Sequence, residues 1–301
     1  MTILITGGTG WIGQALVPAL LSDGHTVRIL SRGSSLPQEF DPSVELAQWA
    51  GPPEPIPDTA LAGVDAVINM AGESLAGGRW TEARKQRLYS SRVDTTQLLV
   101  DAIGRQEQKP SVLISTSAVG YYGDRGDEAI TEAAQPGDDF LAALCSHWED
   151  AAKKVIPHGV RLAIMRMGVV LGTGGGALPQ MVLPFKLFVG GPVGSGRQVM
   201  SWVHRDDVVG ATRFVLEHEE LSGPVNLTAP HPVTNREFSK TLGRVLHRPS
   251  FWPVPAVAIR LLFGEMGDTV LKGQRVIPKR LQEFGYEFTY PEVEGALRVS
   301  V

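Results

Sequence analysis

A glycine-rich turn near the start of the chain constrains the fold more than any other feature of the sequence. Gly7, Gly10 and Gly13 recur at every third position, after the apolar run Thr2–Ile5 and at the start of the helix-like segment Ile12–Ser22. A tight turn between a strand and a helix explains this order, because glycine tolerates backbone conformations and close approaches that a Cβ forbids. The sequence therefore predicts a strand–turn–helix unit here.

The alternation of strand and helix patterns continues over about the first 170 residues. Strands that alternate with helices form a parallel sheet covered on both faces, and near-continuous apolar runs are typical of its buried strands. We therefore expect an α/β protein with a Rossmann-type doubly wound parallel sheet. The later predicted strands are Thr26–Leu30, Val44–Trp49, Ala66–Met70, Val112–Thr116 and Leu162–Met165, and the later predicted helices are Thr81–Ile103 and Phe140–Val155.

The pattern changes after about Leu171. A glycine-rich loop follows at Gly172–Gly176, and turn and proline signals then separate two amphipathic helical stretches, Thr234–Leu246 and Pro255–Phe263. We expect a smaller C-terminal α+β lobe that caps the sheet and contacts a substrate. The predicted division is residues 1–171 for the Rossmann domain, with a returning strand near residues 225–228, and residues 172–301 for the smaller lobe.

Composition excludes several classes of function. A formal net charge of −4 argues against a general phosphate-binding surface for nucleic acid. Cys145 is the single cysteine, so neither an intrachain disulfide nor a cysteine-built zinc site can form, and we predict no metal. No signal-peptide pattern precedes the first strand, and the most apolar later stretch, Met181–Gly191, is too short to span a bilayer. We expect a cytoplasmic protein that binds neither nucleic acid nor membrane.

The glycine spacing also predicts a ligand. In a dinucleotide-binding turn, one glycine allows the turn, a second lets the backbone approach the pyrophosphate, and a third lets helix and strand pack closely. The helix N-terminus then offers free N–H groups and a positive dipole to the phosphates. An ordinary glycine-rich turn is the alternative, which a second strand at the right distance makes less favourable. The predicted cofactor contacts in the turn are Gly7, Thr9, Gly10, Trp11, Ile12 and Gly13.

The end of the second predicted strand indicates which dinucleotide binds. A site for NAD usually places Asp or Glu there to bond the ribose hydroxyls, but this chain has Ser31 and Arg32. A guanidinium can donate two hydrogen bonds at once to a 2′-phosphate, and a serine hydroxyl can support it. We therefore predict NADP(H) as the cofactor, with a solvated loop arginine as the alternative interpretation of Arg32.

Beyond these motifs, the whole chain resembles the extended short-chain dehydrogenase/reductase superfamily, and most closely its atypical SDR39U1-like branch. That branch is described as an NAD-dependent epimerase/dehydratase with a C-terminal domain of unknown function. The resemblance implies further cofactor contacts at Met70, Ala71 and Val170, and a pyrophosphate contact from Arg92, for which a surface charge is the alternative. The residues that carry the resemblance are Thr6–Gly13, Asn69–Glu73, Ser90–Arg92, Ser115–Ser117, Gly120–Gly123, Leu144–Cys145, Trp148–Glu149, Gly190–Pro192, Trp202–His204, Gly273–Arg275 and Pro278.

The resemblance also implies catalytic residues, and here the chain departs from the family pattern. Ser117 stands where relatives place the hydroxyl that bonds the reacting oxygen of the substrate. Relatives also use a Tyr-x-x-x-Lys pair, whose lysine lowers the pKa of the tyrosine. Leu141 and Cys145 occupy those two positions. Tyr121 and Tyr122 are the nearest replacements, with the alternative that one fills the core and the other lines the cleft without chemistry.

Other polar residues bear on the substrate. Nucleotide-sugar epimerases hold a diphosphate with an arginine at the position of Met200, so the resemblance argues against a UDP-sugar; Arg197 is a nearby substitute. His204 is a candidate general base or a buried structural histidine. Of the pair Asp206 and Asp207, we expect Asp207 to cap a helix that begins at the next residue.

Two classes of function remain after these observations. The first is an NADP(H)-binding oxidoreductase or epimerase that acts on an unidentified carbonyl or sugar-like small molecule. The second is a non-catalytic NADP(H)-binding sensor or partner-binding protein, which the missing Tyr–Lys pair favours. The fold does not decide between the two, because this scaffold hosts both catalysts and binders. The sequence leaves open the substrate, the direction of the reaction and the oligomeric state.

Overall fold

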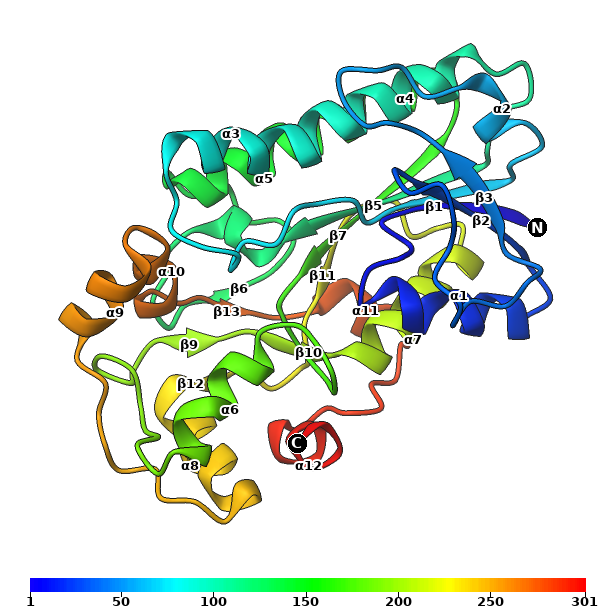
Figure 1. Cartoon of the computed structure of the whole chain (residues 1–301). Helices are drawn as coiled ribbons and strands as arrows, with labels where there is room; N and C mark the ends of the chain where they lie inside the picture. Colours follow the sequence, from blue (N-terminus) through cyan, green and yellow to red (C-terminus); the bar gives the residue numbers. More distant parts are fainter.

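A seven-stranded parallel sheet forms the centre of the computed structural model, which describes all 301 residues (Figure 1). Its strand order is β11-β7-β5-β4-β1-β2-β3, and every neighbouring pair is parallel. This confirms the predicted Rossmann-type doubly wound sheet. The strands of the sheet are β1 (Thr2–Thr6), β2 (Thr26–Ser31), β3 (Glu45–Gln48), β4 (Ala66–Asn69), β5 (Val112–Ala118), β7 (Arg161–Met167) and β11 (Gly223–Leu227).

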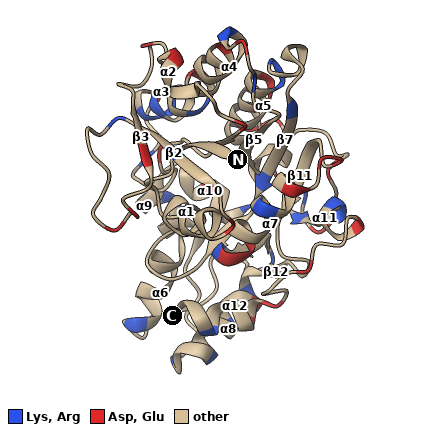
Figure 2. Ribbon diagram, turned by 90° about the vertical axis from the view of Figure 1, so that its right-hand side faces the viewer, with Lys and Arg blue, Asp and Glu red and all other residues tan.

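Helices cover both faces of the sheet because successive strand residues point to opposite sides. Ile3 and Ile5 of β1 join an apolar cluster with residues of α1 and α7, whereas Leu4 joins a second cluster with residues of α2, α4 and α5. The middle strands are almost free of charge, and the charged residues lie mainly on helices and loops (Figure 2). The helices of this half are α1 (Gly13–Ser22), α2 (Asp58–Leu61), α3 (Glu82–Tyr89), α4 (Thr95–Arg105) and α5 (Phe140–Lys153), together with α7 (Arg205–Glu217).

The long helix predicted over Thr81–Ile103 is interrupted. A π-helical turn, η1 (Ser90–Asp94), separates α3 from α4. Ser91 and Arg92 in this wider turn both bond the backbone of Glu73, which follows β4. Turns of this kind occur frequently at functional sites. A short 3₁₀ turn, η2 (Val119–Tyr122), likewise follows β5.

The smaller lobe packs below the sheet in Figure 1, around its own apolar cluster. Within this lobe, β9 (Val199–Met200) pairs with β12 (Val233–Thr234). Two further two-stranded sheets join the lobe to the first 171 residues: β8 (Val169–Leu171) with β10 (Trp202–His204), and β6 (Ala129–Ile130) with β13 (Arg275–Val276). The returning strand predicted near residues 225–228 overlaps β11, which pairs with β7. The remaining helices are η3 (Ile156–His158), α6 (Leu178–Lys186), α8 (Asn235–Leu246), α9 (Ala256–Phe263), α10 (Met266–Leu271), α11 (Lys279–Glu283) and α12 (Val293–Ser300).

No helix in the structure has the length and apolar character that a membrane crossing requires. The apolar stretch Met181–Gly191 contributes instead to α6, whose Val182 and Phe185 pack into the core of the smaller lobe.

Candidate functional site

The glycine turn has the close packing that its sequence predicts. Gly7 has a φ of +70°, and a Cβ placed on it would lie 2.6 Å from the carbonyl oxygen of Met70. A Cβ placed on Gly13 would lie 2.2 Å from the carbonyl oxygen of Gly8. Only glycine fits both positions without displacing backbone atoms. The turn therefore brings the start of α1, the end of β1 and the end of β4 into direct contact.

The start of α1 offers unused hydrogen-bond donors. The backbone N–H groups of Trp11, Ile12 and Gly13 donate to no protein acceptor. Ile12 precedes the helix without a side-chain cap, and no acidic residue lies in its first turn. Free N–H groups at a helix N-terminus form a binding site for a phosphate or another anion, which the helix dipole reinforces. Thr9, in the same turn, accepts a 3.3 Å hydrogen bond from Gln14 through its carbonyl.

The indole of Trp11 joins the turn to the smaller lobe. Its Nε1–H donates to the carbonyl of Thr173 at 2.9 Å, and the guanidinium of Arg205 lies 5.2 Å from the ring centre. A Cβ on Gly175 or Gly176 would lie 2.4 Å or 2.8 Å from atoms of the indole. The glycine-rich loop after β8 therefore packs directly against the indole of Trp11. This contact was not predicted from the sequence, although the run of glycines indicates a close approach.

Arg32 lies exposed at the end of β2, with its guanidinium in no hydrogen bond or ion pair. Its Cδ lies 3.3 Å from the position that a Cβ on Gly51 would take, so the loop after β3 supports the side chain. The hydroxyl of Ser31 accepts a hydrogen bond from the N–H of Gly33 at 3.2 Å. An unpaired guanidinium is thus available one strand away from the glycine turn, because β2 is the neighbour of β1.

Thr6 holds the segment that follows β4. Its hydroxyl donates to the side-chain oxygen of Asn69 at 2.7 Å and accepts from the N–H groups of Met70 and Ala71 at 3.2 Å and 3.1 Å. Met70 and Ala71 therefore lie beside the glycine turn in fixed positions. Val170 lies half-buried on β8, paired with β10. Direct contact of these three residues with a cofactor stays a prediction.

Arg92 is buried, which the sequence analysis did not foresee. Its guanidinium donates to the carbonyls of Glu73 at 2.8 Å and Leu88 at 3.2 Å, and lies 5.4 Å from the ring centre of Trp148. A Cβ on Gly72 would lie 3.1 Å from its Cζ. Burial lowers the pKa of Arg92, since no carboxylate bonds the guanidinium directly. Its predicted contact with a pyrophosphate remains a prediction.

Ser117 is part of a buried ionic network at the end of β5. Its hydroxyl donates to Oε1 of Glu149 at 2.8 Å. Arg166 of β7 pairs with both oxygens of the same carboxylate, each contact measuring 2.8 Å. All three residues are almost fully buried. The Glu149–Arg166 pair was not predicted from the sequence, although an arginine inside a largely apolar strand is a signal for a buried partner.

The two tyrosines after Ser117 both lie beside the Arg166 guanidinium, with their ring centres 3.6 Å and 5.0 Å from its Cζ. The hydroxyl of Tyr122 donates to Oδ1 of Asn226 at 2.6 Å and accepts from Nη1 of Arg166 at 2.9 Å. Burial raises the pKa of Tyr122 to about 12, so its phenol keeps its proton at neutral pH. Tyr121 is half-buried, and its ring centre lies 3.6 Å from Cζ of Arg166. Catalytic roles for both tyrosines stay predictions, and the structure shows Tyr122 as a core residue.

The positions of the missing Tyr–Lys pair hold groups that do not exchange protons at neutral pH. Leu141 packs against Gly120, where a Cβ would lie 3.3 Å from the Cβ of Leu141. Cys145 is buried, and burial raises the pKa of its thiol to about 12. Ser117 is therefore left without the usual acid–base partners on α5, and Glu149 of the same helix is its hydrogen-bond acceptor instead.

Two residues of the smaller lobe have structural roles. His204 caps α7, because its ring accepts a hydrogen bond from the N–H of Asp206. Burial lowers the pKa of His204. The prediction that Asp207 caps the helix is wrong, because α7 begins at Arg205 and Asp207 lies within its first turn. The buried carboxylate of Asp207 instead accepts from the N–H groups of Thr289 and Tyr290, at 2.7 Å and 3.0 Å, and so anchors the chain before α12.

Comparison with known proteins covers the whole chain. Residues 3–227 match the model of the NAD dependent epimerase/dehydratase family, and residues 254–299 match a domain of unknown function, DUF1731. The chain is 41% identical to the epimerase family protein YfhF of Bacillus subtilis, over 99% of this chain and 97% of that protein. It is 38% identical to the mouse epimerase family protein SDR39U1, over 99% of both chains. The crystal structure of human SDR39U1 with NADPH superposes with a TM-score of 0.87 and 36% identity, over 99% of this chain and 98% of that one.

Proposed function

Because the chain belongs to the NAD-dependent epimerase/dehydratase family, we propose that it binds NADP(H) at the glycine turn and acts as an atypical short-chain dehydrogenase/reductase. Its reaction is an oxidoreduction or epimerisation of an unidentified carbonyl or sugar-like small molecule. One observation carries the proposal: three free N–H groups at the start of α1 lie one strand away from the unpaired guanidinium of Arg32. The NADPH bound to the human relative supports the same cofactor.

The phosphate groups of the cofactor have matching groups in the chain. The N–H groups of Trp11, Ile12 and Gly13 suit the pyrophosphate, since they supply donors without a competing carboxylate. Arg32, with Ser31 beside it, suits the 2′-phosphate that distinguishes NADP from NAD. A bound nicotinamide would supply hydride exchange at the carboxyl ends of the strands, where doubly wound sheets place their ligands.

Replacing Arg32 by Ala should remove the preference for the phosphorylated cofactor. We expect NADPH to bind about 10- to 100-fold more weakly, which corresponds to the loss of one or two charge-assisted hydrogen bonds. NADH affinity should not change, because NADH has no 2′-phosphate. Calorimetric titration of both nucleotides measures the effect, with Arg197→Ala as the control for loss of an exposed, unpaired arginine. Equal loss of NADPH and NADH affinity would contradict this role for Arg32.

Ser117 and Glu149 provide a path for the proton that accompanies hydride transfer. The Ser117 hydroxyl donates to Glu149, so its oxygen is free to accept a hydrogen bond from a substrate hydroxyl. When the substrate alcohol is oxidised, its proton moves to Ser117 Oγ, while the bound nicotinamide would accept the hydride. The original Ser117 proton then moves to Oε1 of Glu149. In this arrangement, the hydrogen-bonded pair of Ser117 and Glu149 takes the role of the missing Tyr–Lys pair.

Turnover in a Ser117→Ala variant tests this assignment. We expect NADPH consumption with a panel of aldehydes, ketones and sugars to fall by about 100-fold or more, the usual contribution of a positioned proton-transfer group. The dissociation constant for NADPH should not change, because Ser117 belongs to the proton path and not to the phosphate site. Ser117→Thr keeps the hydroxyl and should retain activity. Full turnover in Ser117→Ala would remove Ser117 from the mechanism.

A non-catalytic NADP(H)-binding sensor or partner-binding protein is the second candidate. The observation that favours it is the pair Leu141 and Cys145, which supplies no proton exchange at neutral pH, together with the buried phenol of Tyr122. This candidate predicts tight NADPH binding without consumption. Multiple turnover of any purified small molecule would rule it out. A cytoplasmic location, without nucleic-acid or membrane partners, stays a prediction from the sequence.

A further inference from the structure

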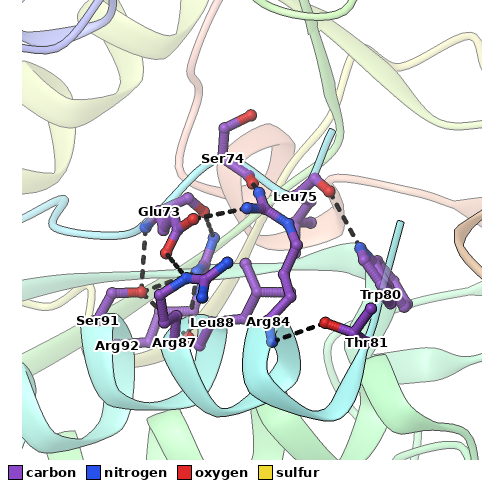
Figure 3. Close-up of polar contacts among 10 residues, drawn as sticks. All are labelled: Glu73, Ser74, Leu75, Trp80, Thr81, Arg84, Arg87, Leu88, Ser91 and Arg92. Carbon is purple, nitrogen blue, oxygen red and sulfur yellow. Dashed lines mark hydrogen bonds and ion pairs between the residues drawn. The ribbon is translucent and has the colours of Figure 1, made fainter. Parts of the chain in front are cut away.

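A cluster of three arginines surrounds one carboxylate beyond the end of β4. We define the arginine cluster as Arg84, Arg87 and Arg92, which converge on Glu73 in Figure 3. Arg84 and Arg87 come from α3, and Arg92 comes from the π-helical turn η1. Arg84 pairs with Oε1 of Glu73 at 2.7 Å, whereas Arg92 bonds the backbone carbonyl of Glu73 and not its carboxylate.

The cluster carries more positive charge than its own carboxylate can balance. Arg84 and Arg92 are only 8% and 9% exposed, yet the single acidic side chain that pairs with the cluster, Glu73, is 34% exposed. Buried charges in proteins are normally paired, because an unpaired charge loses its hydration without compensation. Three guanidinium groups and one carboxylate leave a local excess of two positive charges, which favours a bound anion.

Two of the arginines also keep unused hydrogen-bond donors. The buried Nε of Arg84 has no acceptor. The guanidinium of Arg87 makes no hydrogen bond in the structure; its Nε lies 3.7 Å from Oε2 of Glu73, and its side chain is 58% exposed. Hydrogen bonds to backbone carbonyls account for Arg92, which donates to Glu73 and Leu88, and for Nη2 of Arg84, which donates to Ser74. They leave Nε of Arg84 and the guanidinium of Arg87 without a hydrogen-bond partner.

The position of the cluster relates it to the proposed cofactor site. A Cβ on Gly7 would lie 2.6 Å from the carbonyl oxygen of Met70, and a Cβ on Gly72, two residues further along the same segment, would lie 3.1 Å from Cζ of Arg92. The cluster therefore lies just beyond the turn, past the carboxyl end of β4. This is the edge at which doubly wound sheets bind their ligands.

We propose that the arginine cluster binds the negatively charged end of the substrate, which is a carboxylate or a phosphate. Arg87 supplies the exposed bidentate donor, and Arg84 and Arg92 supply the buried positive charge. Glu73 holds the guanidinium groups in place and competes with the incoming anion for them. This inference rests on the proposed function, because it assigns the substrate of that site, and it adds that the substrate is anionic.

The test is a calorimetric titration of inorganic phosphate and of malonate into the full-length protein saturated with NADPH, at constant ionic strength. Saturating NADPH fills the phosphate site at the start of α1, so remaining anion binding that depends on Arg87 reports the arginine cluster. We expect one saturable site with a dissociation constant on the order of millimolar for the better of the two anions. Comparison of phosphate with malonate then indicates which kind of anionic group the site prefers.

Two variants with opposite expected effects distinguish a binding site from a structural cluster. Arg87→Gln should weaken anion binding at least tenfold, and it spares the buried arginines. Glu73→Gln should strengthen anion binding, because it removes the competing charge. Lys240→Gln, at an exposed lysine on α8, is the control for loss of a surface positive charge elsewhere. The proposal is overturned by the absence of saturable binding, by an unchanged Arg87→Gln variant or by weaker binding in Glu73→Gln.

The same titrations separate failure of this inference from failure of the proposed function. A protein that binds NADPH but neither anion keeps its proposed cofactor and loses the anionic substrate. Saturable anion binding that depends on Arg87, in a protein that does not bind NADPH, would retain the arginine site and reject the proposed function. Anion binding to the cofactor-free protein that NADPH abolishes would mean that the cluster holds the phosphates of the cofactor, which overturns the proposal.

Discussion

Replacement of Arg166 by Met is expected to destabilise the protein by about 3–5 kcal/mol, the typical cost of breaking a buried ion pair by removing one partner. The carboxylate of Glu149 would remain almost fully buried without its two hydrogen bonds from Arg166. The hydroxyl of Tyr122 would also lose its donor. Urea unfolding followed by circular dichroism measures the change in the free energy of unfolding.

The double variant Glu149→Leu/Arg166→Met is the matched control. When both charges are removed, no buried ion is left unpaired, so the double variant should be more stable than Arg166→Met alone. If the free energy of unfolding of Arg166→Met lies within about 1 kcal/mol of the wild type, the ion pair contributes no more than an exposed one does. Water or a rearrangement would then compensate the Glu149 carboxylate. This result would also remove the basis for treating Glu149 as a fixed proton acceptor for Ser117.

Replacement of Gly13 by Val is expected to lower NADPH affinity by at least about 100-fold, equivalent to about 2.8 kcal/mol of binding free energy. The new Cβ would lie 2.2 Å from the carbonyl oxygen of Gly8, so the backbone of the turn has to move. The free N–H groups of Trp11 and Ile12 would then lose the positions that suit a pyrophosphate. Calorimetric titration with NADPH measures the loss.

The exposed neighbour Gln14 provides the control for this experiment. Gln14→Ala changes the same turn of α1 without adding an atom to the packed face, and it should leave the affinity within about threefold of the wild type, as surface substitutions usually do. Circular dichroism of Gly13→Val should show a folded protein at the titration temperature. Undiminished NADPH binding by a folded Gly13→Val protein would show that the cofactor does not use this turn.

The sheet was predictable because its strands have two sequence signals: each is an apolar run, and each alternates with a helical segment. Ala66–Met70 and Val112–Thr116 were predicted as strands and form β4 and β5, since residues buried on both faces leave little room for polar side chains. The glycine turn was predictable because its packing admits only glycine. The π-helical turn inside Thr81–Ile103 was not, because hydrophobic periodicity does not distinguish one wider turn within a helix.

The polar parts of the site were harder to predict because they depend on contacts between distant residues. The partners Glu149 and Arg166 lie on α5 and β7, and no local pattern states that their side chains meet. Asp207 was assigned a local role as a cap, whereas its true partners are the N–H groups of Thr289 and Tyr290, far along the chain. The burial of Arg92 was hard to predict for the same reason, because a charged residue in a helical segment is usually exposed.

The position of β11 at the edge of the sheet has a consequence for how the protein is made. During synthesis, β7 leaves the ribosome well before β11, which can pair with it only after the whole segment from α6 to α7 has been made. Until then the nascent chain carries an unpaired strand edge, a known starting point for aggregation. The two lobes are therefore not separable units: a fragment ending at residue 171 would lack the last strand of its own sheet.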